Sequence, residues 1–267
     1  MDKTLRTRGI TAIVFAAVVF TLIFLSPLSQ LLLFLIIGVG AGYELLKMSK
    51  ASNVQKILLL SLIVVLYGLV YLNYIDASLL QMTTVVIVVI YSLLALDLLK
   101  GKAILINTLP YLIFIYPGFF ALGLINEIQS SKEAVSTLLI TTLLLIWAND
   151  SFAYLIGRKI GKRPLNKKIS PKKTLEGFYA GGIFTILTAI LLSFYFPSFS
   201  VTGWMGLGVT VWLSSVIGDL VQSAFKRHYG IKDSGNILPG HGGFFDRFDS
   251  FIFTLPFVYL ITTLLQN

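Results

Sequence analysis

Long stretches without any charged residue restrict the fold of this chain more than any other feature. Seven of them cover residues 9–43, 57–75, 77–96, 103–126, 134–149, 177–218 and 250–267. The hydrocarbon core of a bilayer is about 30 Å thick, so a helix that crosses it needs about 20 apolar residues. Backbone polar groups in lipid must bond within their own segment, which favours helices. The sequence therefore predicts an all-α, polytopic integral membrane helix bundle.

Two of these stretches are too long for one span. Pro27 and Pro197 interrupt them, and a proline ends a helix or begins a new one. We therefore expect about nine transmembrane helices within a single polytopic domain, 1–267. Residues 1–126 would supply the N-terminal spans, and 134–267 the later spans and the polar loops. The nine predicted spans are 10–26, 28–46, 57–74, 79–99, 103–125, 134–156, 177–196, 201–225 and 250–266.

The positions of the basic residues predict the orientation of the chain. Twenty of the 21 Lys and Arg residues lie in the N-terminal tail or in even-numbered loops, and only Lys132 does not. Positive charge collects in cytoplasmic loops. We therefore expect the N-terminus in the cytoplasm and the C-terminus outside. The polar loops, and any active site built from them, would face the cytoplasm from the cell (cytoplasmic) membrane.

The net charge of +9 could suggest a nucleic-acid partner, but topology explains most of it. The loops show no pattern of an RNA- or DNA-binding module. Basic loops at a membrane attract anionic lipid head groups instead. We expect membrane lipid, and no nucleic acid, as a partner. The chain has no Cys, which excludes disulfides and thiolate metal sites.

Acidic residues inside or beside the spans are costly and usually functional. Asp219 follows a charge-free run, and helical spacing places Ser223 and Lys226 or Arg227 on its face. A purely structural alternative to a functional role is that Asp219 makes a hydrogen bond to a neighbouring helix. Asp150, beside Asn149, ends the sixth span.

Simple ion pairs could account for other acidic groups. A salt bridge to the basic loop is the alternative for Asp150. Glu44 and Asp97 lie near helix ends, Glu44 within reach of Lys47 and Asp97 within reach of Lys100 or Lys102. We therefore expect interfacial ion pairs there.

The polar segment 232–250, together with charged residues shortly before it, combines three kinds of group. Asp246 and Asp249 are three residues apart, so on a helix they share a face and could hold Mg²⁺ together with Asp219. Glycines around His241, including Gly242 and Gly243, allow the backbone to approach an anion through its N–H groups. The phosphate-binding charge would come from Lys226, Arg227, Lys232 and Arg247. Together these groups predict phosphoryl or nucleotidyl transfer at the membrane face.

Two sequence blocks then resemble one family. The segment "SAFKRHYGIKDSGNILPGHGGFFDRFD", 223–249, is similar at every fixed position to the pattern of the phosphatidate cytidylyltransferases (CDP-diacylglycerol synthases). The block "WANDSFAYLIGRKIGKRPLNKKISPKKTLEG", 147–177, resembles the same family's Asp-bearing helix end and its Ser-Pro-x-Lys-Thr segment. The resemblance covers about the last 130 residues, and the first five spans match only in being hydrophobic.

The resemblance implies a membrane enzyme of phospholipid biosynthesis. It would convert CTP and phosphatidic acid to CDP-diacylglycerol and pyrophosphate, with Mg²⁺ as cofactor. Asp219, Asp246 and Asp249 would bind the metal, with room for a second, monovalent cation. Lys226, Arg227 and Arg247 would contact phosphates, and the loop 241–243 would bind the triphosphate or pyrophosphate.

The second block supplies further expected substrate contacts. Lys173 could contact CTP or the lipid phosphate, and Ser170 is expected to cap a helix that begins at Pro171. Asp150 would bind metal or orient these cations. The remaining expected substrate-binding residues are Asn149, Lys172, Ser223 and Lys232.

Two other functions stay open. A CTP-dependent polyprenol or lipid kinase would use similar loops but transfer the γ-phosphoryl group. An ion-coupled transporter would use Asp150 and Asp219 as coupling sites, but it should repeat its broken helices in both halves. The Gly181-Gly182 pair could pack within one chain or across a homodimer.

Overall fold

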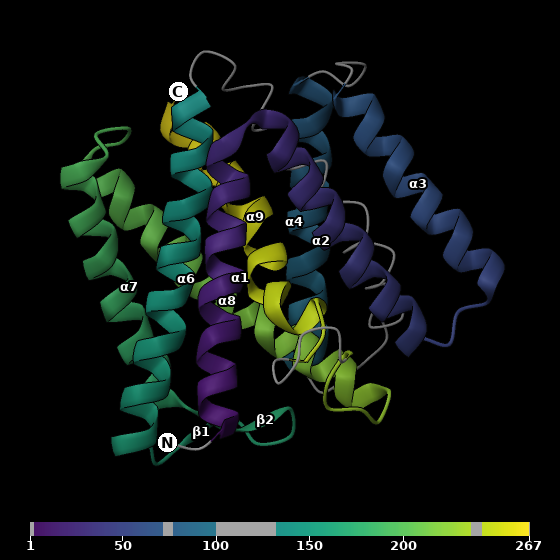
Figure 1. Ribbon diagram of the computed structural model, residues 1–267. Coiled ribbons are helices and arrows are strands. Elements are labelled where there is room, and N and C mark those ends of the chain that lie inside the picture. The colour runs from purple at the N-terminus through teal and green to yellow at the C-terminus, as the bar shows by residue number, and fades with distance from the viewer. Residues whose placement is uncertain (1–2, 72–76, 100–131, 236–241, 267) are drawn as a thin grey trace. The chain divides into compact units, whose positions relative to one another are not determined.

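The computed structural model describes residues 3–71, 77–99, 132–235 and 242–266 (Figure 1). The described chain is mostly helical. Each of its helices overlaps a predicted span, and the predicted span 103–125 lies outside the described residues. The helices are α1 (Lys3–Leu25), α2 (Pro27–Met48), α3 (Asn53–Tyr71), α4 (Ala77–Leu99), α6 (Lys132–Ile160), α7 (Leu175–Tyr195), α8 (Val201–His228) and α9 (Phe245–Gln266).

The prediction of an all-α chain is wrong at one place. Residues Pro164–Asn166 (β1) and Ser170–Thr174 (β2) form a two-stranded antiparallel sheet in the basic loop between α6 and α7. Pro164 pairs with Thr174, and Asn166 pairs with Ser170. The strands are too short and too polar to show an alternating apolar pattern, which is the usual signal for a strand.

Several helices are long and apolar enough to cross a membrane. Within the described residues, five helices meet both conditions. There are also three shorter apolar helical stretches: Val14–Leu25, Asn53–Leu62 and Met82–Asp97. The chain is therefore a polytopic integral membrane protein. The count of nine spans and the orientation stay predictions. The five helical segments are Leu28–Met48, Thr137–Ile160, Leu175–Tyr195, Val201–His228 and Phe245–Leu265.

A local hydrogen-bond motif explains why the first charge-free stretch makes two helices. Ser26 has extended backbone angles and forms a capping box with Ser29. The Ser29 N–H donates to Ser26 Oγ at 3.1 Å, and the Ser26 N–H donates to Ser29 Oγ at 2.9 Å. Pro27 follows at the first helical position, where its missing N–H costs nothing. The predicted break at Ser26-Pro27 is confirmed.

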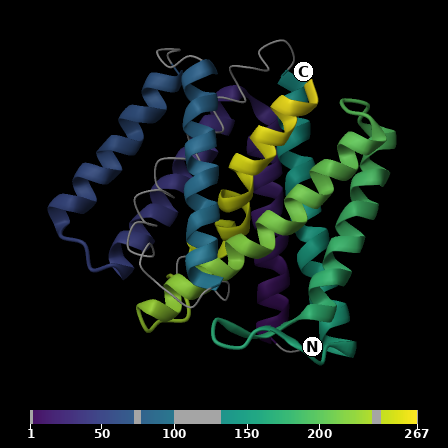
Figure 2. The same cartoon turned by 180° about the vertical axis from the view of Figure 1, so that it is seen from behind.

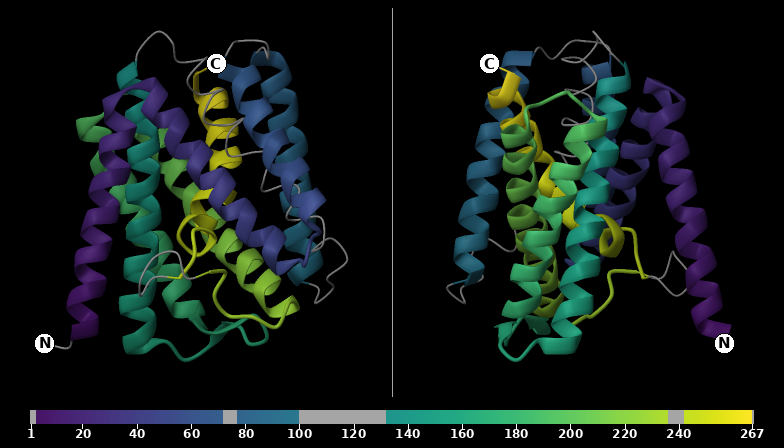
Figure 3. Two further views of the ribbon diagram at one scale, coloured as in Figure 1. Left: turned by 45° about the vertical axis from the view of Figure 1, so that its right-hand side comes forward. Right: turned by 90° about the vertical axis from the view of Figure 1, so that its left-hand side faces the viewer.

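The described chain falls into two compact units, each assembled from two stretches of sequence. Unit 1 contains 1–136 and 225–249, and unit 2 contains 137–224 and 250–267. In unit 1, α2 packs against both α1 and α3, as the left view of Figure 3 shows. The single polytopic domain stays a prediction.

In unit 2, α6 and α7 run side by side, and the β1–β2 hairpin joins them at one end (Figure 2). Small residues let the two helices approach closely. A Cβ added to Gly177 would lie 2.6 Å from the Ala153 carbonyl oxygen, so only glycine fits there. Phe152 and Phe184 stack with their ring centroids 3.8 Å apart. This close contact fixes the end of α6 that carries the polar residues.

Residues 201–224 of α8 and 250–266 of α9 complete unit 2. The Trp212 ring of α8 covers Gly182 of α7, and its Nε1–H donates to the Phe178 carbonyl oxygen at 3.0 Å. The Ser214 hydroxyl of α8 donates to Thr254 Oγ1 of α9 at 3.1 Å. The Ser214–Thr254 bond is buried and the Trp212–Phe178 bond is partly buried, so both help to fix the relative positions of the helices within this unit.

Replacing Gly182 with alanine is expected to destabilise the protein by roughly 1–3 kcal/mol, because the new methyl group would overlap the half-buried Trp212 ring. The midpoint of thermal unfolding in detergent measures this effect. Gly206→Ala on α8 is the matched control, because nothing lies within 4 Å of the added Cβ. This control is expected to leave the midpoint unchanged or to raise it by helix propensity. Equal destabilisation by both substitutions would contradict the packing described here.

Candidate functional site

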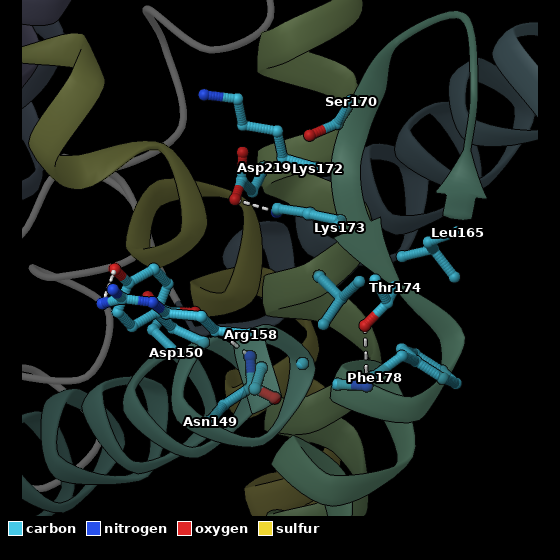
Figure 4. Close-up of a pocket in the computed structure, with 15 residues that line it drawn as sticks. Asn149, Asp150, Arg158, Leu165, Ser170, Lys172, Lys173, Thr174, Phe178 and Asp219 are labelled. Carbon is cyan, nitrogen blue, oxygen red and sulfur yellow. Dashed lines mark hydrogen bonds and ion pairs between the residues drawn. The ribbon is translucent and has the colours of Figure 1, made fainter. Parts of the chain in front are cut away.

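A cavity of about 730 Å³ lies in unit 2 and is lined by α6, α7, α8 and the β1–β2 hairpin (Figure 4). Its volume falls within the range of about 300–1,000 Å³ that is typical of small-molecule sites. Residues of the sequence block 147–177 line it together with Asp219 of α8, although Lys173 and Asp219 are 46 positions apart. The predicted site residues in its wall are Asn149, Asp150, Ser170, Lys172, Lys173 and Asp219.

An ion pair joins the block 147–177 to helix α8 inside this cavity. Lys173 Nζ of β2 donates to Asp219 Oδ2 of α8, and Figure 4 shows the two side chains pointing toward one another. The Ser223 hydroxyl donates to Asp219 Oδ1 at 3.3 Å, which confirms the predicted helical spacing of these two residues. The two charged side chains are 33% and 29% exposed. An incoming anion could therefore reach Lys173 from the cavity.

The end of α6 contributes a second carboxylate. Asn149 is buried, and its Nδ2 donates to Asp150 Oδ1 at 3.2 Å and to Ser215 Oγ at 3.4 Å. These bonds hold Asp150 at the wall of the cavity, where its carboxylate interacts electrostatically with Asp219 and Lys173. Two carboxylates and the Lys173 ammonium group thus lie together in the cavity.

Two further cations, Arg158 and Lys172, line the cavity, and both are exposed. Arg158 Nη1 donates to the Tyr154 hydroxyl at 3.3 Å (Figure 4). Phe178 adds an aromatic ring to the same wall. Cationic and aromatic groups together suit a ligand that carries both phosphates and a planar ring.

The structure corrects the expected role of Ser170. This residue begins β2 and does not cap a helix that starts at Pro171. The N-cap of α7 is Thr174, whose Oγ1 accepts the Gly177 N–H at 3.1 Å. Pro171 is tolerated in β2 because a two-stranded sheet consists only of edge strands. Thr174 was missed because Ser-Pro is also a common helix start.

Glu176, also missed, anchors the loop that carries Lys172 and Lys173. One of its carboxylate oxygens accepts the backbone N–H groups of Lys162 and Arg163, at 3.0 and 3.2 Å. The other accepts Arg163 Nε at 3.2 Å. Glu176 lies in the first turn of α7, where the helix dipole favours a negative charge. The two ends of the loop are thereby tied together.

Glu176→Gln is expected to lower kcat/KM about 2- to 10-fold, the equivalent of one net hydrogen bond, because the loop that presents Lys173 loosens. Arg163→Leu is the graded control. It removes only an ion pair whose arginine side chain is 72% exposed, and exposed pairs contribute little. Steady-state kinetics of both variants test this order of effects. A larger loss with Arg163→Leu than with Glu176→Gln would refute it.

Unit 1 holds a second group of predicted residues around Asp246, in the first turn of α9. Lys226 Nζ donates to Asp246 Oδ1 at 2.7 Å. The backbone N–H groups of Ser234 and Gly243 donate to Asp246 Oδ2 at 2.8 and 3.1 Å. The Lys226 and Asp246 side chains are only 12% and 8% exposed. This buried ion pair fixes the start of α9.

The other predicted residues of unit 1 lie around this pair. Gly242 has a φ of 82°, and a Cβ there would lie 2.7 Å from Asp246 Oδ2, so only glycine is accommodated without strain. Arg227 Nη1 donates to the Ile231 carbonyl oxygen at 2.9 Å. Lys232 and Arg247 are exposed. Asp249 lies three residues after Asp246 on α9, as predicted, and His241 lies outside the described residues.

Metal ligands are not grouped in the part of the chain that the structure describes. Within the described residues, no group of three or more His, Asp or Glu side chains is arranged so that it could hold a metal ion. The assignment of Asp219, Asp246 and Asp249 to a common metal site therefore stays a prediction.

Comparisons with known proteins agree with the resemblance of the two sequence blocks. The profile of the cytidylyltransferase family matches residues 6–265. A phosphatidate cytidylyltransferase of Bacillus subtilis (strain 168) is 34% identical over 266 residues, 97% of this chain and 98% of the relative. A phosphatidate cytidylyltransferase of Staphylococcus aureus (strain COL) is 45% identical over 146 residues. One of Staphylococcus haemolyticus is 50% identical over 120 residues. The chain spans about half the length of these staphylococcal relatives: 55% of the Staphylococcus aureus protein and 46% of the Staphylococcus haemolyticus protein.

Proposed function

The chain belongs to the cytidylyltransferase family, and we propose that it transfers the cytidylyl group of CTP to phosphatidic acid. The products are CDP-diacylglycerol and pyrophosphate. The observation that carries the proposal is the cavity in which Lys173 pairs with Asp219 beside Asp150, Arg158 and Lys172. The full-length similarity to the Bacillus subtilis phosphatidate cytidylyltransferase supports the same substrates.

The reaction requires little proton transfer. An oxygen of the lipid phosphate attacks the α-phosphorus of CTP, and the bond from that phosphorus to the bridging oxygen of the β-phosphate breaks. Pyrophosphate leaves with the electron pair of that bond. The nucleophile is already an anion, so a strong general base is not needed. The protein must instead position two polyanions that repel each other, and stabilise the charge that moves onto the leaving group.

Residues of the cavity have the chemistry for this task. Lys173 would exchange its Asp219 partner for a phosphate oxygen, and its partial exposure permits that exchange. Arg158 offers a planar, forked donor for phosphate, whereas Lys172 offers a point charge. Ser170, Asn149 and Ser223 would complete the polar wall, either directly or through Asp150 and Asp219.

The predicted residues of unit 1 keep their proposed roles. Asp246 and Asp249 remain candidate metal ligands. The cations Lys226, Arg227, Lys232 and Arg247 remain candidate phosphate contacts, together with the glycine segment 241–243.

Mg²⁺ is the proposed cofactor. The donor set in the cavity fits a hard cation, because Asp150 and Asp219 present carboxylate oxygens to the same space. Mg²⁺ is commonly held by one or two carboxylates together with substrate phosphates, so a third protein ligand is not required. When bound, it would neutralise phosphate charge. A second, monovalent cation and a homodimer also remain proposals.

The membrane setting suits a reaction between a lipid and a nucleotide. The chain is an integral membrane protein with several spans, so the diacyl tails of phosphatidic acid can stay in the bilayer. We place the reaction at the cytoplasmic face, where CTP is available and where the basic loops are predicted to lie.

The identity of the lipid acceptor tests this proposal. Purified protein in mixed micelles is supplied with CTP, Mg²⁺ and one of three lipids: phosphatidic acid, diacylglycerol or a polyprenol. Mass spectrometry of the lipid products is expected to show CDP-diacylglycerol from phosphatidic acid and no product from the two alcohols. A phosphorylated alcohol would instead identify a CTP-dependent kinase. The absence of any product from all three lipids would contradict the proposal.

A further inference from the structure

A buried carboxylate from the N-terminal part of the chain holds the segment that leads into α9. Glu44 of α2 is only 2% exposed. Its Oε2 accepts the Ser234 hydroxyl at 2.6 Å and the Phe245 N–H at 3.0 Å, and its Oε1 accepts the Phe244 N–H at 2.9 Å. The expected interfacial pair with Lys47 is wrong, because Glu44 points into unit 1 while Lys47 is exposed.

The surrounding chain is shaped to admit this carboxylate. A Cβ added to Gly235 or to Gly243 would collide with the Glu44 side chain. One turn earlier on α2, a Cβ on Gly40 would lie 3.0 Å from the Phe244 ring. These glycines let the backbone of the segment close around Glu44. A buried charge is tolerated only when hydrogen bonds compensate for its lost solvation, and Glu44 has three donors.

The same segment also holds Asp246. Ser234 gives its hydroxyl to Glu44 and its backbone N–H to Asp246. Gly243 gives its N–H to Asp246, and the next two N–H groups go to Glu44. The same stretches of chain therefore supply the hydrogen-bond donors of both carboxylates. Moving that backbone away from Glu44 would also displace Asp246 and its ion pair with Lys226.

We propose that Glu44 is a positioning residue that pre-organises residues 242–246, and with them the Asp246–Lys226 pair, for substrate binding. The kinetic part of this inference rests on the proposed function, whereas the structural part does not. Glu44 touches no substrate in this scheme. It acts by keeping the segment in one conformation before CTP or lipid arrives.

Glu44→Gln separates charge from packing, because glutamine has nearly the same shape and volume. Its amide nitrogen is a donor, so at least one of the three donors that face Glu44 loses its acceptor. If the ordered segment falls to about a tenth of its population, the apparent KM rises about 10-fold. Saturating substrate restores the ordered state, so kcat is expected to stay within about 2-fold.

Hydrogen–deuterium exchange of the ligand-free, full-length protein in detergent gives a readout that is independent of activity. The amides of Phe244 and Phe245 are expected to exchange at least about 10-fold faster in Glu44→Gln, because local opening becomes easier. Amides of α7 should not change. Tyr43→Phe is the matched control, since it alters the neighbouring, exposed side chain of α2. Glu44→Asp, which keeps the charge on a shorter side chain, should give an intermediate effect.

Each outcome decides one part of the inference. Unchanged exchange at Phe244 and Phe245 in a folded Glu44→Gln protein would overturn it. Faster exchange without a rise in KM would confine Glu44 to a structural role and overturn the positioning role. If Glu44→Gln does not fold, Ser234→Ala removes one donor, and unchanged exchange in that variant would overturn the inference too. If the protein transfers no cytidylyl group, the proposed function fails, while the exchange result still tests the contact.

Discussion

Replacing Lys173 with methionine is expected to lower kcat/KM for cytidylyl transfer about 10²- to 10³-fold, the usual loss when one pre-organised charged or hydrogen-bonding group is removed from a reaction centre. Lys173 is the ammonium group that faces Asp219 in the cavity. Without it, the phosphates lose a cation, and Asp219 faces Asp150 without a balancing charge. The rate of CDP-diacylglycerol formation at sub-saturating CTP measures the effect.

Lys167→Met is the matched control for this substitution. Lys167 lies in the turn of the same hairpin, is exposed and does not line the cavity. Its replacement changes the net charge by the same amount, so it is expected to keep the wild-type rate. A Lys173→Met protein with wild-type kcat/KM would exclude Lys173 from the reaction. Equal losses in both variants would indicate an effect of net charge alone.

Lys226→Met is expected to destabilise the protein by roughly 3–5 kcal/mol, because it leaves the carboxylate of Asp246 buried without its cation. The two side chains are only 12% and 8% exposed, so water compensates for the lost cation only in part. The free energy of unfolding in detergent, from denaturant titration, measures the loss. The exposed Lys232 gives a control, and Lys232→Met should change stability by no more than about 0.5 kcal/mol.

A second substitution separates the buried charge from the lost packing. Asp246→Asn keeps an oxygen that can accept the Ser234 and Gly243 N–H groups but carries no charge. The double variant Lys226→Met, Asp246→Asn should therefore recover much of the lost stability. A double variant less stable than Lys226→Met alone would contradict the role given to the ion pair.

The sequence predicts the helices well because one physical cost dominates in lipid. A charged or unpaired polar group is expensive in hydrocarbon, so charge-free stretches mark helices, and Pro27 marks a break. The predicted wall residues Asn149, Asp150 and Lys173 likewise share a cavity with Asp219. The polar groups at the end of α6, in the hairpin and on α8 have few other places to lie in an apolar chain.

Contacts between distant parts of the chain were not predictable in this way. Glu44 meets partners 190 to 201 positions away, and no local pattern specifies that meeting. The nearby Lys47 offered a simpler partner, but a lysine near a helix end can reach solvent. The β1–β2 hairpin was missed for a related reason. Its stability depends on anchors such as Glu176, and its few strand residues carry no alternating pattern.

The fate of each phosphorus atom of CTP tests the central claim most directly. Purified protein is incubated with phosphatidic acid and CTP labelled at either the α- or the γ-phosphate, with Mg²⁺ or with a chelator. The account predicts that α-label enters the lipid and that γ-label leaves as pyrophosphate, and that both require the metal. Label from the γ-phosphate in the lipid, with none from the α-phosphate, would contradict cytidylyl transfer and establish a kinase.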